Sequence, residues 1–141
     1  MNLYNELRNR QQSEFNSFPM AFAYNKEQFV DGMRKLGLEP EETDKVVKIS
    51  AGGFIRKKDS NDFSAMLKRH KSQMDKAIAE DKTGAGFIKD MFAYELANHE
   101  YDYTGDLEDT LDALDLTIEK VNANPKLLKG LKLALRRYST W

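Results

Sequence analysis

The stretch "KVVKISAGGFIRKKD", residues 45–59, decides the fold class, because it holds the clearest β-strand signal in the chain. Two β-prone runs, 46–50 and 54–57, flank a Gly-Gly pair, which is the pattern of a hairpin. A lone hairpin is marginal in water, so these strands must pack on helices or gain a third strand, for which 18–24 is the available segment. We therefore predict a small hairpin or short antiparallel sheet.

The rest of the chain carries helical patterns. Asn25 is placed to cap a helix, with Gln28 as its capping-box partner, and Gly37 is placed to end it. The predicted helices cover 3–16, 26–36, 40–45, 60–81, 87–100, 104–121 and the residues after Asn124-Pro125. The sequence thus predicts a compact α+β domain, mostly α, of about five to six helices, spanning residues 1–141 as a single domain.

Apolar residues at helical spacing indicate which faces are buried. In the N-terminal helix they predict that Leu3, Leu7 and Phe15 point inward. The two longer patterns consist of Phe63, Leu67, His70, Met74 and Ala77, and of Leu107, Leu111, Leu114, Ile118 and Val121.

Composition narrows the class of protein. The chain has 40% hydrophobic and 32% charged residues and a net charge of −1, which is typical of a folded globular protein. No apolar run approaches the roughly 18 residues of a membrane span, and the N-terminus lacks a signal-peptide core. The absence of cysteine excludes disulfides, thiolate metal sites and a cysteine nucleophile. We expect a cytoplasmic protein.

Charge is distributed unevenly along the C-terminal half. Residues 90–119 carry ten acids and no bases, whereas residues 120–141 carry six bases and no acids. On one continuous helix, four acids form a ridge beside the apolar stripe, at a spacing of roughly 5–6 Å that resembles a phosphate backbone. These residues are Glu108, Asp112, Asp115 and Glu119. The ridge is either a solvated flank or a surface for a partner with basic charge.

Glu95 and His99 lie four residues apart on the largely apolar helix 87–100, where they can form a hydrogen-bonded pair or two metal ligands. Only one other histidine, His70, exists, and its place on an apolar stripe favours a hydrogen-bonded core residue. We therefore predict a structural role for Glu95 and His99, no metal, no cofactor and no enzymatic activity.

Two further patterns offer anion sites. "TGAG", residues 83–86, precedes a helix N-terminus that could hold a phosphate, but the P-loop pattern is absent and a helix break is favoured. The last helix carries a basic patch, with Tyr138 and Trp141 nearby, formed by Lys129, Lys132, Arg136 and Arg137. Because the net charge is near zero, we expect direct nucleic-acid binding to be weak or absent.

Four segments together resemble a family of small uncharacterised proteins carried by bacterial phages and conjugative elements. They are "FPMAFAYNKEQFVDGMRKLGL", "GGFIRKKDSNDFSAMLKRH", "DKTGAGFIKDMFAYELANHEYDYTGDLEDTLDALDL" and "NPKLLKGLKLAL", and they cover nearly the whole chain from Phe18. The resemblance implies no catalytic residues. It implies a mobile-element context, in which compact proteins often bind a host protein, and inhibitors of CRISPR nucleases are one such class.

Three functional hypotheses follow. The first is a protein that binds a host protein with a basic surface, such as a CRISPR effector nuclease, through the acidic ridge. The second is a small enzyme or metal protein centred on Glu95, His99 and His70. The third is a nucleic-acid-associated protein that uses the basic C-terminal helix.

Overall fold

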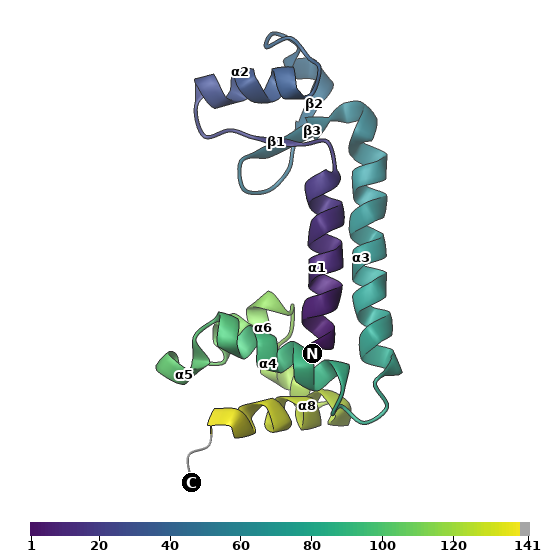
Figure 1. Ribbon diagram of the computed structural model, residues 1–141, viewed down its shortest axis with the longest axis vertical. Helices are drawn as coiled ribbons and strands as arrows, with labels where there is room; N and C mark the ends of the chain where they lie inside the picture. The colour runs from purple at the N-terminus through teal and green to yellow at the C-terminus, as the bar shows by residue number, and fades with distance from the viewer. Residues whose placement is uncertain (139–141) are drawn as a thin grey trace. The chain divides into compact units, whose positions relative to one another are not determined.

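The computed structural model describes residues 1–138 and combines eight α-helices with a three-stranded antiparallel sheet (Figure 1). The predicted class, α+β and mostly α, is confirmed. Two compact units divide the chain: a sheet unit, Ser13–Lys71, and a helical unit, formed by Met1–Gln12 with the chain from Ser72 onward. Helices α1 (Leu3–Ser17) and α3 (Ser60–Glu80) each contribute one end to each unit. The single-domain assignment stays a prediction.

The sheet unit contains the predicted hairpin and the third strand. Strands β1 (Ala21–Phe22), β2 (Val46–Lys48) and β3 (Gly53–Arg56) lie in the order β1-β3-β2. Ala21 pairs with Phe54, and Val47 pairs with Ile55. The hairpin turns through Ala51 and Gly52, both at positive φ. The segment predicted as a helix over 40–45 forms only a 3₁₀ turn, η1 (Thr43–Lys45).

Helix α2 (Lys26–Lys35) covers one face of the sheet and has the predicted caps (Figure 1). The Asn25 side chain accepts the Gln28 N–H at 2.8 Å, while the Gln28 side chain accepts the Tyr24 N–H at 2.7 Å. Gly37 has φ +77° and ends the helix. Met33 and Leu36 pack on Phe54 and Ala21 to form a small apolar core. On α3, Phe63 contacts the rings of Phe15 and Phe18.

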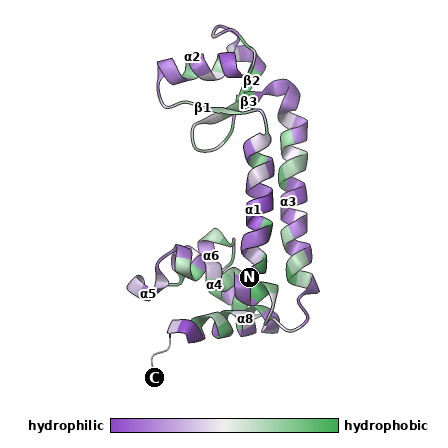
Figure 2. Cartoon of the chain, viewed as in Figure 1, coloured by the Kyte–Doolittle hydropathy of each residue, from purple (hydrophilic) through white to green (hydrophobic). Residues whose placement is uncertain are grey.

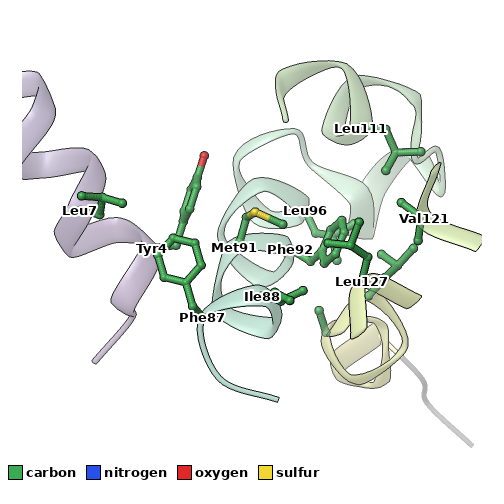
Figure 3. Packing of buried hydrophobic residues seen from close by; sticks show 12 residues of the cluster. Tyr4, Leu7, Phe87, Ile88, Met91, Phe92, Leu96, Leu111, Val121 and Leu127 are labelled. Atoms are coloured by element: carbon green, nitrogen blue, oxygen red, sulfur yellow. The ribbon is translucent and has the colours of Figure 1, made fainter. Parts of the chain in front are cut away.

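Helix α4 (Phe87–Asn98) is the centre of the helical unit (Figure 3). Its buried residues spread over a wide arc of this largely apolar helix: Phe87, Ile88, Met91, Phe92, Glu95 and Leu96. Helix α8 (Pro125–Leu135) packs along it through Leu127, Leu131 and Ala134. Gly130 permits this close packing, because a Cβ there would lie 2.4 Å from the Ile88 Cγ2.

The first turn of α1 is tied to α4 by polar contacts. The Leu3 N–H donates to the Asp90 carboxylate at 2.8 Å, and the Asn2 side chain donates to the Asp90 carbonyl at 2.9 Å. Tyr4 stacks edge-on against Phe87, with ring centroids 5.9 Å apart. These contacts place the Tyr4 hydroxyl beside the buried side chains of α4.

Three short helices and a 3₁₀ turn complete the described part of the helical unit: α5 (Tyr101–Thr104), α6 (Glu108–Ala113), α7 (Ile118–Asn122) and η3 (Arg136–Tyr138). Leu111 and Val121 reach the core from α6 and α7. Helix α8 begins at Pro125, where a helix was predicted, and the Asn124 side chain caps it by accepting the Lys126 and Leu127 N–H groups.

Two inward assignments were wrong. Leu3 is 45% exposed and Leu67 is 44% exposed, whereas the adjacent Tyr4 and Met66 are buried. In α1 Tyr4 takes the inward direction at this turn because it meets Phe87 and Tyr94, while Leu7 is buried as predicted. In α3 Met66 is buried in place of Leu67, while Met74 and Ala77 pack against the core as predicted.

Candidate functional site

The acidic ridge does not lie on one helix, contrary to the prediction. The helix expected over 104–121 is divided into α6 and α7, and Asp115 between them has φ +55°. Ile118, expected to point inward, is 41% exposed. A regular phosphate-like spacing of Glu108, Asp112, Asp115 and Glu119 on a single helix is therefore not formed.

The break follows from local capping. The Asp115 N–H donates to the Asp112 carbonyl and the Leu116 N–H to the Leu111 carbonyl, which is the hydrogen-bond pattern of a Schellman C-terminus. Aspartate tolerates the left-handed conformation better than most residues. Thr117 then starts α7, its side chain accepting the Lys120 N–H at 3.2 Å. The pair of Asp115 and Thr117 was the sequence signal for this break.

The acids of the ridge nevertheless belong to a strongly anionic region, which we call the acidic segment, residues 100–119. Its eight carboxylates are all exposed: Glu100, Asp102, Asp106, Glu108, Asp109, Asp112, Asp115 and Glu119. Within residues 1–138 none of them forms an ion pair. Tyr103, within the segment, is 91% exposed. The segment therefore offers unneutralised negative charge beside an exposed aromatic ring.

Glu95 is buried in the core of the helical unit, only 3% exposed, and its Oε1 has no hydrogen-bond partner within residues 1–138. Burial raises the pKa of the Tyr4 hydroxyl above its ordinary value, and the charge of Glu95 and a hydrogen bond to it raise it further. The Arg8 guanidinium lies over the rings of Tyr4 and Tyr94. The Tyr4 hydroxyl of α1 is thus a polar neighbour of the Glu95 side chain, and the Thr110 hydroxyl of α6 donates to the Glu95 carbonyl.

His99 does not pair with Glu95 as predicted. Its Nε2 is buried and, like Glu95 Oε1, finds no hydrogen-bond partner in the described chain. The backbone N–H of His99 donates to the Glu95 carbonyl, as a helix end requires. His70 belongs to the sheet unit, where its Nε2 lies 2.6 Å from Glu14 Oε1. The predicted hydrogen bond is present, but His70 is only half-buried and not the core residue that was predicted.

The TGAG loop is filled by the protein's own carboxylate. Asp81 accepts the N–H groups of Gly84 at 2.9 Å and Ile88 at 2.9 Å, and those of Thr83 and Gly86 at 3.2 Å each. Partial burial raises the pKa of Asp81, but these four donors together outweigh it and hold the pKa below its ordinary value. The donors that a phosphate would need at the start of α4 are already occupied, which supports the helix-break interpretation.

We expect Asp81→Asn to lower the free energy of unfolding at neutral pH by about 1–3 kcal/mol, because an amide group cannot satisfy four donors as a carboxylate does. Because the pKa of Asp81 is lower in the folded state than in the unfolded state, its carboxylate stabilises the fold at pH values above the unfolded-state pKa. This contribution is lost as the pH falls through the folded-state pKa. Urea unfolding of the wild type and of Asp81→Asn at pH 7 and at about pH 3 measures the difference in their free energies of unfolding. A difference that is unchanged at the lower pH would contradict the assignment, and Asp62→Asn, an exposed aspartate, is the control.

The basic patch lies on α8 and η3. Lys129, Lys132, Arg136 and Arg137 are all exposed, and none forms an ion pair in the described part of the chain. Figure 2 shows α8 as mainly hydrophobic until its C-terminal end, where the arginines follow. Lys129 and Lys132 share one face of the helix because they are three residues apart. Trp141, considered with this patch, lies outside the described residues.

Residues 1–138 contain neither the ligand cluster of a metal site nor a helix suited to cross a membrane. No three His, Asp or Glu side chains gather there closely enough to hold a metal ion. None of the helices in this range has the length and apolar character that a membrane crossing requires.

A core of α4, α8 and short helices, with a small antiparallel sheet covered by α2, defines a mostly helical α+β protein. The chain belongs to a family of unknown function, DUF7659, which it matches over residues 3–137. The resemblance to an uncharacterised family is thereby confirmed, while the phage or mobile-element origin stays a prediction. No curated protein and no solved structure matches the chain.

Proposed function

We propose that this chain is a non-enzymatic protein that binds a partner with a basic surface through the acidic segment. The observation that carries the proposal is that the acidic segment holds eight exposed carboxylates without ion pairs among residues 1–138, together with the exposed ring of Tyr103. Unneutralised like charges repel one another, and a basic partner relieves that repulsion. Tyrosine is among the residues that most often dominate interface energies, so Tyr103 is the expected anchor.

The class of partner that fits best is a nucleic-acid-processing enzyme, whose substrate groove is basic. A nuclease of bacterial host defence, such as a CRISPR effector, is the proposed example, and the chain would inhibit it by occupying that groove. Because α6 and α7 are separate helices, the proposal rests on charge and exposed area rather than on phosphate spacing.

Four neutralising substitutions test this proposal: Glu108→Gln, Asp112→Asn, Asp115→Asn and Glu119→Gln. The fold should persist, because all four side chains are exposed and asparagine tolerates the conformation at position 115. Binding to the partner should weaken at least about tenfold, and wild-type binding should fall steeply with salt, since ions screen such attraction over roughly 8–10 Å. The partner is first captured from a bacterial lysate and identified by mass spectrometry, then titrated at two salt concentrations.

A matched control neutralises four exposed acids of the sheet unit, with Glu27→Gln, Glu39→Gln, Glu41→Gln and Asp62→Asn. This variant has the same net charge as the first and should bind like the wild type. Tyr103→Ala should weaken binding without changing charge. If both quadruple variants bind equally well, the acidic segment is only a solvated surface.

A second candidate function is a small enzyme or metal site at Glu95 and His99. The observation in its favour is that both side chains hold a buried polar atom without a partner. We expect elemental analysis of the purified protein to find no stoichiometric transition metal. One metal per chain that disappears in His99→Ala would favour this second function over the first.

A further inference from the structure

The apolar core of the sheet unit is open at one end. A hollow of about 480 Å³ lies where α2, η1 and the β2–β3 hairpin meet. Its walls include Ala23, Phe29, Val46 and Phe54, which also form or pack against the core of this unit. The rings of Phe29 and Phe54 are 5.1 Å apart and make an aromatic wall. A hollow of this size and apolar character is typical of sites for small ligands.

A single charged side chain, Lys48, lines this hollow. Val46 and Lys48 are alternate residues of β2 and therefore share one face of the strand, the face on which Val46 packs against the core. Lys48 is exposed and forms no ion pair within residues 1–138. Its neighbour Lys45, by contrast, is paired with Glu42. The hollow thus combines an apolar body with one free cation and no acid.

We propose that this hollow binds a small organic carboxylate whose aromatic or aliphatic body fills the apolar cavity and whose carboxylate pairs with Lys48. The charge of Lys48 selects an acid over an amine of the same shape. The site lies entirely in the sheet unit, so it is independent of the acidic segment and of the partner proposed for it.

The test compares three probes of equal shape, the naphthaleneacetate ion, naphthaleneethanol and naphthaleneethylamine, titrated into the full-length protein by NMR. We expect the acid to bind about fivefold to tenfold more tightly than the amine, with the alcohol between them. The amide shifts should centre on Phe29, Val46 and Ile49. Equal binding of the acid and the amine, or shifts confined to other residues, would overturn the proposal.

Three variants locate the effect. Lys48→Gln should abolish the preference for the acid while leaving the alcohol's affinity unchanged, and Lys57→Gln, an exposed lysine that does not line the hollow, should keep the preference. Thr43→Phe places a ring at the exposed rim of the hollow and should weaken all three probes. A Lys48→Gln protein that still prefers the acid would show that another cation selects the ligand, contrary to the proposal.

Discussion

Gly84→Ala should lower the free energy of unfolding by about 2–5 kcal/mol, a large part of the stability of an ordinary domain. Gly84 has φ +87°, a conformation that costs roughly 1–2 kcal/mol for an alanine. An added Cβ would also lie 2.4 Å from the Lys126 carbonyl oxygen and 3.1 Å from its carbon. These are backbone atoms at the start of α8 and cannot rotate away, so overpacking adds about 1–3 kcal/mol.

Gly105→Ala separates the two contributions. Gly105 has φ +68°, and an added Cβ there would meet no atom within 4 Å, so only the conformational cost applies. Urea or thermal unfolding of both variants should show Gly84→Ala as clearly less stable than Gly105→Ala. Similar unfolding curves would mean that the loop before α4 does not contact α8 closely.

Replacing the buried polar pair Tyr4 and Glu95 by Phe and Leu should stabilise the fold by about 1–3 kcal/mol at neutral pH. A buried carboxylate oxygen without a partner is unfavourable, and apolar residues of similar volume often replace such groups with a gain in stability. Glu95→Leu alone should gain less, because it deprives the Tyr4 hydroxyl of its acceptor. The measurement is a double-mutant cycle by urea unfolding.

Tyr4→Phe alone is the informative control in this cycle. It should destabilise the protein by about 1–3 kcal/mol, because the Glu95 carboxylate then loses its hydroxyl neighbour while staying buried. If the double variant is less stable than the wild type, Glu95 serves structure, as the sequence predicted. If it is more stable, Glu95 is kept at a cost to stability, as residues at functional sites often are.

The local elements were largely predictable, because their signals are short-range. Asn25 caps α2, Gly37 ends it, and the Gly-Gly hairpin formed with the expected third strand. The helix predicted over 104–121 failed for a local reason as well. A continuous leucine pattern concealed the left-handed Asp115 and the capping Thr117, and the acidic ridge was lost with that helix.

The candidate sites were less predictable than the local elements, because their geometry depends on parts of the chain that are distant in sequence. That the carboxylates of the acidic segment would be exposed and unpaired was foreseeable, since residues 90–119 hold no bases. It was not foreseeable that Asp81 would accept the N–H groups before α4. The letters "KTGAG" do not indicate how the loop folds back on the end of the preceding helix. Glu95 and His99 were expected to bond to each other, yet Tyr4, about ninety residues away in sequence, is the group beside Glu95.

By itself, then, the sequence determined the class of fold, the hairpin, the caps and the charge of residues 90–119, because each depends on residues within a few positions of one another. Only the tertiary structure decided that Tyr4 is buried in place of Leu3, that no side chain fits at Gly84 and Gly130, and what surrounds Glu95. These features arise where α1, α4 and α8 meet, and such packing depends on the shapes of surfaces that no local pattern records.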